Sequence, residues 1–333
     1  MISVMDEYLV HQIESTVDHV ASTDVNWQDR FYFNFLDRQG RFSGLLGYGA
    51  YPNRNIQEGV FRAVCDNKLY IANFTRTVNH DREKIFADGL AVNVVEPMKK
   101  WRVSFDLKDP AVKADLEFSG RNVPYEFVPI FHRRNGQVVW NQVHYTQAGS
   151  YTGSVSIGGQ TFTDLVGIRD RSWGLRNIQE LDLWIWVSAN FGSYWLTAWH
   201  SETAAGKVIC SDGAIMYDGK TEVVPIVHME HDIQFEPGKR TPKSARYLLT
   251  DENGKRTEVL AQARDTIFVG LVPPGVVDLS DPGQLDMQDK TAGIFDQMQE
   301  FRVGSDVGRG LTEFLVVGGS EKYKDRWTAM VPR

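Results

Sequence analysis

The most constraining feature of this 333-residue chain is a long succession of short strand-like runs separated by turn-forming pairs. In residues 31–36 phenylalanine alternates with other side chains, which is the period of two that strands show. Pairs such as Asn135-Gly136 and Gly158-Gly159 then predict turns between the runs. A long antiparallel meander leaves exposed edges unless the sheet closes. We therefore expect closed or strongly curled antiparallel sheets.

The strand-like runs fall into two groups, one on each side of the middle of the chain. The first group comprises residues 31–36, 42–51, 59–66, 68–77, 90–96, 100–107, 114–118, 142–146, 150–157 and 160–168. The second comprises residues 183–189, 194–201, 207–217, 221–233, 244–250, 256–263, 266–272, 293–303 and 310–318. The proline-containing segments 123–134 and 273–289 are predicted to be loops. The division predicts an N-terminal helical segment over residues 1–26 and two β-barrel domains, over residues 27–175 and 176–333.

The N-terminus and the overall composition exclude several classes of protein. Apolar side chains recur among acidic ones in residues 1–20, which predicts a short amphipathic helix instead of a signal peptide. No apolar run approaches the roughly 20 residues needed to span a bilayer, so we expect a soluble protein of the cytoplasm. The 36 basic and 43 acidic residues give a net charge of -7, which disfavours a nucleic-acid partner. The only cysteines, Cys65 and Cys210, fall in different predicted domains, so no disulfide framework is expected. The sequence leaves open whether the protein forms an oligomer.

Residues 167–174, with the sequence Gly-Ile-Arg-Asp-Arg-Ser-Trp-Gly, place opposite charges beside a tryptophan at the midpoint of the chain. Charges near a buried indole lose hydration, so they must be paired. One interpretation is a structural clamp in which Asp170 accepts hydrogen bonds from Arg169 or Arg171 while Trp173 caps the core. The other is that Asp170 or an arginine faces a cavity as an acid, a base or an anion stabiliser. The sequence leaves both interpretations open.

The segment that follows is the most aromatic of the chain. Strand alternation places Asp182, Trp184 and Trp186 on one face and aliphatic side chains on the other. The next strand contributes Tyr194, Trp195, Trp199 and His200. A two-residue turn would place Trp184 opposite Trp199, whereas a longer loop would place His200 opposite Asp182.

The two registers have different consequences. In the second, a carboxylate would orient an imidazole for acid–base chemistry, and otherwise His200 is a polar residue at the end of a strand. The indoles either fill a barrel core or line a pocket for a mostly apolar ligand, and we favour the pocket.

Signals for metals, nucleotides and nucleophiles are weak. His228 and Glu230 share one face of a predicted strand while His231 lies on the other, so a metal site there would need a bulge. The glycines of residues 304–310 lack a surrounding βαβ unit, and no Gly-x-Ser-x-Gly motif occurs. We expect no cofactor and no metal.

The pattern of residues 167–174, together with Gly-Arg-Gly-Leu-Thr-Glu at residues 308–313, resembles the carotenoid 1,2-hydratase and AttH-like group of two-domain lipocalin-like proteins. This group is similar in turn to tocopherol cyclases and to certain fungal and bacterial cyclases. Many relatives have a histidine at the position of Arg171, so the chain departs from the pattern there. The resemblance implies an all-β fold of two tandem lipocalin-like antiparallel β-barrels with a short N-terminal helix, and a ligand cavity at or near the junction of the barrels.

The resemblance also implies hydration, dehydration, isomerisation or cyclisation of apolar substrates without a cofactor. Our leading hypothesis is a lyase- or isomerase-type enzyme that acts by acid–base chemistry on a hydrophobic small molecule, such as an aromatic or terpenoid compound. The predicted catalytic residues are Asp170, Asp182 and His200, with Arg169 or Arg171 orienting a carboxylate or polarising an oxygen. The predicted ligand-binding residues are Tyr48, Trp173, Trp184, Trp186, Tyr194 and Trp199. The alternatives are a non-catalytic carrier of a hydrophobic ligand and a scaffold that binds a partner protein.

Overall fold

The chain folds into two all-β units. The computed structural model describes residues 2–9, 20–78, 85–87, 89–177, 181–237, 239–269, 273–280, 293–317 and 322–323. The first unit comprises Met1–Asn177 and Val272–Asp281, and the second comprises Ile178–Leu271 and Pro282–Arg333. The first unit thus includes residues 272–281 from late in the chain. The division predicted from the sequence placed these residues in the second domain.

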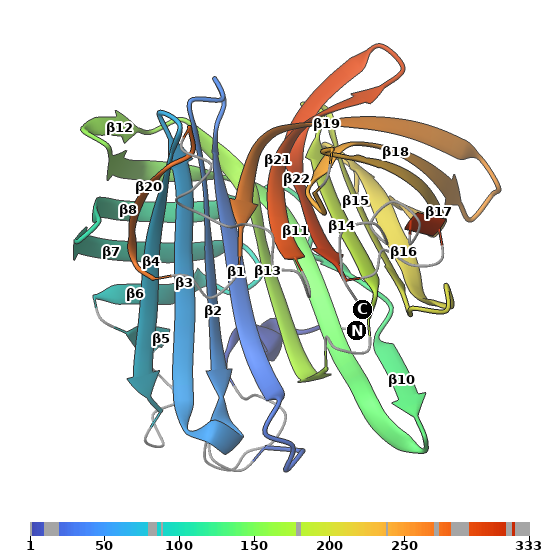
Figure 1. Ribbon diagram of the computed structural model, residues 1–333, viewed down its shortest axis with the longest axis horizontal. Coiled ribbons are helices and arrows are strands. Elements are labelled where there is room, and N and C mark those ends of the chain that lie inside the picture. Colours follow the sequence, from blue (N-terminus) through green and yellow to red (C-terminus); the bar gives the residue numbers. More distant parts are fainter. Residues whose placement is uncertain are drawn as a thin grey trace. The chain divides into compact units, whose positions relative to one another are not determined.

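The first unit contains a 14-stranded antiparallel sheet. Its main path runs in the order β20-β4-β3-β2-β1-β13-β11-β8-β7-β6-β5, and β9, β10 and β12 pair with β11 (Figure 1). The strands are β1 (Trp27–Asp37), β2 (Phe42–Tyr51), β3 (Ile56–Cys65), β4 (Lys68–Thr77), β5 (Ile85–Ala87), β6 (Leu90–Glu96), β7 (Lys100–Lys108), β8 (Ala111–Gly120), β9 (Tyr125–Glu126), β10 (Ile130–Arg134), β11 (Gln137–Ile157), β12 (Gln160–Phe162), β13 (Leu165–Arg176) and β20 (Gly275–Asp278). Two 3₁₀ helices, η1 (Val4–Glu7) and η2 (Pro52–Arg54), accompany the sheet.

The sheet of the first unit curls around one aromatic core. Phe31, Phe33 and Phe35 of β1 are buried there, as their alternation predicts. Phe61 of β3 lies 4.9 Å from Phe105 of β7 between ring centroids, although five strands separate β3 from β7 in the sheet order. Such a contact requires the two arms of the sheet to face each other. The expected curling is therefore confirmed.

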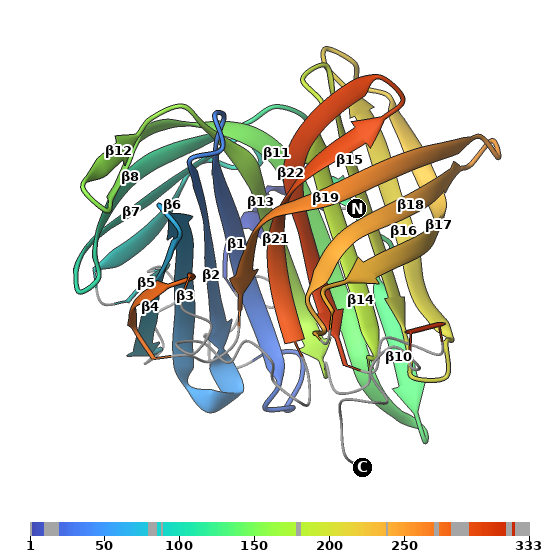
Figure 2. The same ribbon diagram turned by 45° about the horizontal axis from the view of Figure 1, so that its top comes forward.

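The second unit is a closed antiparallel barrel (Figure 2). Its eight strands are β14 (Leu183–Asn190), β15 (Tyr194–Glu202), β16 (Val208–Tyr217), β17 (Val223–Phe235), β18 (Pro242–Asp251), β19 (Arg256–Phe268), β21 (Gly293–Val303) and β22 (Asp306–Val316). Each strand pairs with the next in this list, and β22 pairs back with β14. Closure gives every strand two neighbours, which is why the meander needs no protected edge.

Three segments differ from their predicted structure. Residues 123–134 contain β9 and β10 because β11 is long enough to pair with additional short strands. The expected loop over residues 273–289 begins with β20, which pairs with β4, and residues 281–289 lie outside the described residues. Of the predicted N-terminal helix, η1 is described and residues 10–19 lie outside the described part. None of the described helices has the length and apolar character of a membrane-crossing helix.

Both cysteines are free thiols within the cores, and we expect them to be unreactive in the native protein. Burial, with a smaller effect of Asp212, raises the pKa of Cys210 to about 12, and burial also raises the pKa of Cys65. A free thiol has a pKa of about 8.5. At pH 8 the thiolate fraction of Cys210 is therefore lower than that of a free thiol by roughly three orders of magnitude. A disulfide exchange reagent at pH 8 should label neither thiol rapidly in native protein and both in urea. Rapid labelling before unfolding would contradict this burial.

Candidate functional site

The central motif forms β13, which lies between β1 and β11. Alternation along the strand separates its side chains into two sets. Arg171 faces the aromatic core, with its guanidinium 3.9 Å from the centroid of the Phe31 ring. Asp170 faces the other side of the sheet, where it contacts His144. The charges of the motif therefore belong to two separate clusters.

Arg171 ties the N-terminal segment to the sheet. Its side chain is fully buried and forms an ion pair with the equally buried Asp29 of β1. It also donates hydrogen bonds to the carbonyl oxygens of Asp6, at 3.0 Å, and Tyr8, at 2.9 Å. Burial lowers the pKa of Arg171, but the combined effects of Asp29, Tyr145 and Glu7 outweigh it and the net pKa is raised. These contacts of Arg171 are structural, and its predicted role in orienting a substrate stays a prediction.

Arg169 forms a second connection to the same segment. Its Nη2 lies 2.7 Å from Oε1 of Glu7 in η1, and both side chains are buried. Tyr145 donates a hydrogen bond of 2.9 Å to the same Glu7 oxygen, and Arg169 Nε donates one of 2.8 Å to Gln147. Neither arginine pairs with Asp170. The predicted structural clamp is formed instead with Glu7 and Asp29 as the carboxylate partners.

Asp170 forms a buried carboxylate–imidazole pair with His144 of β11. The distance from Asp170 Oδ2 to His144 Nε2 is 2.9 Å, and the two side chains are 10% and 4% exposed. The Phe127 ring stacks on the imidazole at 4.8 Å between centroids, with 22° between the planes. The carboxylate fixes the orientation of the imidazole ring, and the Phe127 ring covers one of its faces. This pair can therefore hold and transfer a proton.

Gly167 of the motif is needed for close packing. A Cβ at this position would lie 2.1 Å from the backbone oxygen of Asn34 and 2.5 Å from its side-chain oxygen, which accepts a hydrogen bond from the Ile168 amide. We expect Gly167→Ala to destabilise the protein by about 1–3 kcal/mol in urea unfolding, as overpacking does. Gly47→Ala is the matched strand control, because a Cβ at Gly47 meets only ordinary contacts beyond 3.4 Å. Equal stability of the two variants would contradict the prediction.

The β14–β15 hairpin has neither of the registers considered above. Trp186 lies opposite Trp199 and Ile185 lies opposite His200. Asn190 is opposite Trp195, which makes the connection longer than the two-residue turn. His200 thus shares a face with Ile185 and not with Trp184 and Trp186, and the alternative register that would place it opposite Asp182 does not occur.

The indoles and Asp182 occupy the other face of the hairpin. Trp184 and Trp199 lie 5.3 Å apart between centroids, and both are buried, as is Trp186. The backbone of Asp182 donates a hydrogen bond to the Glu202 carbonyl and accepts one from Val317. The expected grouping of these indoles on one face is confirmed by the register, while their contact with a ligand stays a prediction.

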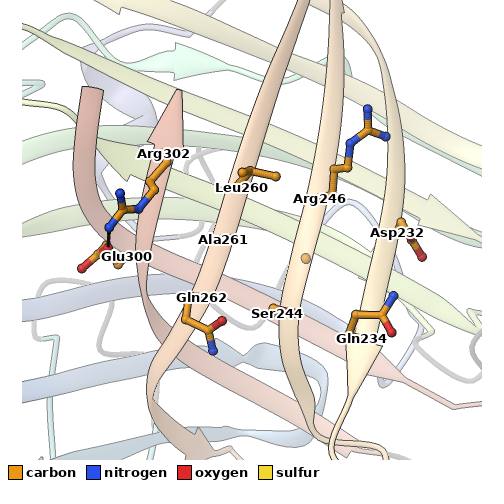
Figure 3. A pocket seen from close by; sticks show the side chains of 10 residues that line it. Asp232, Gln234, Ser244, Arg246, Leu260, Ala261, Gln262, Glu300 and Arg302 are labelled. Carbon is orange, nitrogen blue, oxygen red and sulfur yellow. Dashed lines mark hydrogen bonds and ion pairs between the residues drawn. The ribbon is translucent and has the colours of Figure 1, made fainter. Parts of the chain in front are cut away.

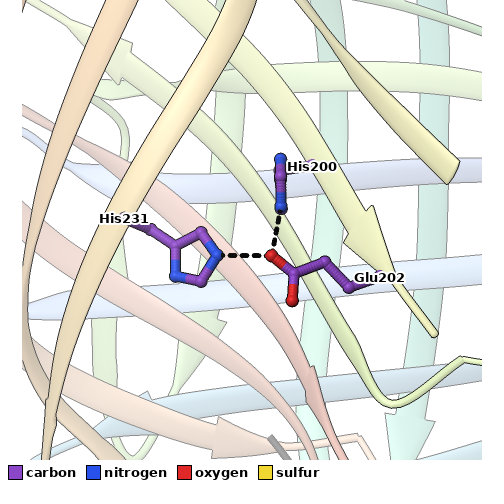
Figure 4. Close-up of side chains that lie close together, drawn as sticks. All are labelled: His200, Glu202 and His231. Carbon is purple, nitrogen blue, oxygen red and sulfur yellow. Dashed lines mark hydrogen bonds and ion pairs between the residues drawn. The ribbon is translucent and has the colours of Figure 1, made fainter. Parts of the chain in front are cut away.

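His200 belongs instead to a cluster inside the second barrel (Figure 4). Its Nε2 lies 2.7 Å from Oε1 of Glu202, and Nε2 of His231 lies 2.9 Å from the same oxygen. Tyr323 contacts Nδ1 of His231 through its hydroxyl at 2.9 Å. Burial raises the pKa of Glu202, but the hydrogen bonds from both histidines outweigh it and hold the pKa below its ordinary value. Burial lowers the pKa of His231.

The remaining predicted ligand-binding residues have local partners. Tyr48 is fully buried in the first unit and donates a hydrogen bond of 2.7 Å to Gln57. Trp173 lies 6.1 Å from Tyr145 between centroids, on the face of Arg171. Tyr194 stacks on Phe191 at 4.7 Å and its hydroxyl lies 3.1 Å from Asp306. Contact of these three side chains with a ligand stays a prediction.

A pocket of about 330 Å³ lies on strands β17, β18, β19 and β21 (Figure 3). Its wall contains the charged residues Asp232, Arg246, Glu300 and Arg302, and Glu300 accepts a hydrogen bond of 2.9 Å from Arg302. No aromatic side chain is among its lining residues, and none of the predicted site residues lines it. This pocket is therefore separate from the predicted site residues.

Several solved structures have a fold similar to that of this chain. A candidate AttH protein from Nitrosomonas europaea has a similar structure, with a TM-score of 0.63 and 14% identity, over 88% of this chain and 93% of the other. Kievitone hydratase from Nectria haematococca gives a TM-score of 0.57 at 12% identity, over 92% and 93%. The structure of CghA with Sch210972 gives 0.57 at 10% identity, over 88% and 89%. No curated protein matches.

The chain is therefore an all-β protein with an AttH-like fold. It belongs to DUF8625, a family of unknown function, whose model matches residues 2–267.

Proposed function

We propose that the protein is a hydratase- or cyclase-like enzyme that acts on a hydrophobic small molecule with Asp170 and His144 as its acid–base pair. The single observation that carries this proposal is the buried 2.9 Å contact between the two side chains on the central motif. The similarity of the fold to kievitone hydratase and to CghA supports the reaction class. Among the predicted catalytic residues, Asp170 and His200 each form a carboxylate–imidazole pair, and Asp170 is the one that belongs to the central motif.

The geometry suits hydration of a carbon–carbon double bond. Asp170 holds Nε2 of His144, so Nδ1 is the ring atom that would exchange a proton with a substrate. The imidazolium would donate this proton to one alkene carbon, the π electrons forming the new C–H bond and leaving a cation on the other carbon. Water would then add to the cation and return a proton to Nδ1. Asp170 would stabilise the imidazolium throughout, and no cofactor is consumed.

Labelled water tests this function directly. We would incubate the protein with a panel of terpenoid and prenylated aromatic alkenes in H₂¹⁸O and follow the products by mass spectrometry. A hydratase gives a product that is heavier by water containing ¹⁸O, and a cyclase or isomerase gives a product of unchanged mass with a new retention time. Ligands that bind but return unchanged under all conditions would identify a carrier and overturn the proposal.

A further inference from the structure

The second barrel contains a set of side chains that the proposed reaction does not use. His200 and Glu202 are two residues apart on β15, and His231 lies on β17. One ligand atom from each lies within 4.8 Å of the others, and all three residues are buried. Figure 4 shows the three side chains pointing toward one another inside the barrel. We propose that His200, Glu202 and His231 bind a divalent transition-metal ion, with Zn²⁺ as the best fit.

The charge distribution of the cluster favours a cation. Oε1 of Glu202 lies between two imidazole nitrogens, at 2.7 and 2.9 Å. Without a metal ion the ring protons of the two histidines make these contacts as hydrogen bonds, and a divalent ion would replace both protons on binding. One divalent ion satisfies both nitrogens and the oxygen together. Two histidines and one carboxylate are also a ligand set that Zn²⁺ uses.

A supporting contact orients His231 as a metal ligand. Metal-binding histidines usually engage their second ring nitrogen in a hydrogen bond that fixes the ring. Nδ1 of His231 lies 2.9 Å from the hydroxyl of Tyr323, which accepts a hydrogen bond of 2.9 Å from the Ile233 amide. Tyr323 is fully buried. The imidazole is thereby held with Nε2 toward Glu202.

The three ligand atoms, which lie within 4.8 Å of one another, would rearrange to admit the ion. Zn²⁺ binds nitrogen and oxygen at about 2.0–2.2 Å, so tetrahedral ligand atoms lie about 3.3 Å apart. The two separations between nitrogen and oxygen would therefore widen by roughly half an ångström. Glu202 is the last residue of β15, and its side chain is 11% exposed, compared with 2% for His200. The ion would enter past this carboxylate, and a fourth coordination position would stay open for water.

The test is metal binding by the whole chain. After treatment with a chelator, the protein is mixed with Zn²⁺ and analysed by native mass spectrometry, and with Co²⁺ for its visible absorption. We expect one ion per chain and the absorption of a tetrahedral Co²⁺ site. His200→Ala, His231→Ala and Glu202→Gln should each lose the ion. His228→Ala, on an exposed residue of the same strand as His231, is the matched control and should keep it.

Two further variants make the result decisive. Tyr323→Phe removes the hydroxyl that orients His231 and should weaken Zn²⁺ binding about 10- to 100-fold without abolishing it. Asp170→Asn should leave the ion bound, so failure of the proposed enzymatic function would not affect this proposal. If the alanine variants do not fold, Zn²⁺ should still raise the melting temperature of the wild type and not that of Glu202→Gln. The proposal would be overturned if the wild type retains no ion. It would also be overturned if Glu202→Gln and His228→Ala bind the ion equally well.

Discussion

Replacing Arg171 with methionine is expected to lower the free energy of unfolding by about 3–5 kcal/mol, which is the usual cost of an unpaired buried charge. The substitution would leave the carboxylate of Asp29 buried without its cation and would release the carbonyl oxygens of Asp6 and Tyr8. Urea denaturation followed by tryptophan fluorescence measures the change. Arg102→Met is the control, because the ion pair of Arg102 with Asp115 is exposed to solvent and its loss should hardly change stability.

A double variant separates the charge from the packing. If the unpaired carboxylate causes the loss, Asp29→Asn combined with Arg171→Met should recover a large part of the stability. If the double variant is as unstable as Arg171→Met alone, the loss comes from the hydrogen bonds to the N-terminal segment instead. A stability of Arg171→Met equal to that of the wild type would show that the buried clamp does not exist in solution.

Asp170→Asn is expected to reduce turnover about 10²- to 10⁴-fold on any substrate that the labelled-water screen identifies, since this is the usual contribution of a positioned acid–base group. The amide retains the shape of the side chain but removes the charge that stabilises the His144 imidazolium. Asp164→Asn is the control, because Asp164 is 66% exposed and pairs with a surface arginine. Full turnover by Asp170→Asn would exclude this acid–base pair.

The fold was largely predictable because strand alternation and turn pairs are local signals. The phenylalanines of β1 and the pairing of β1 with β2 follow directly from them. The closure of the second barrel follows from the cost of exposed edges. The pairing of β20 with β4 could not be predicted, because Gly275 pairs with Ile71, which lies 204 positions earlier in the chain, and a strand of four residues carries little pattern of its own.

The candidate site was predictable only in part, because alternation fixes faces but not partners. Asp170 was identified, but its partner His144 lies on a neighbouring strand and no local signal connects the two. Glu202 could have been added to His200, since residues two apart on a strand share a face. The sequence predicted that His231 and His228 lie on opposite faces of one strand. It did not predict that the face of His231 is the interior of the barrel. The sequence left the register of the β14–β15 hairpin open, because a change in loop length moves every pair along the strand.

Strand β20 limits how the chain can be cut into fragments that each contain one complete unit. Residues 272–281 belong to the first unit, yet they are encoded between two parts of the second. A fragment that stops at residue 177 would lack this strand, and the backbone of β4 would then offer its unpaired amides and carbonyls to other molecules. Because no single cut yields two complete halves, the two units are expected to be inherited, expressed and lost together.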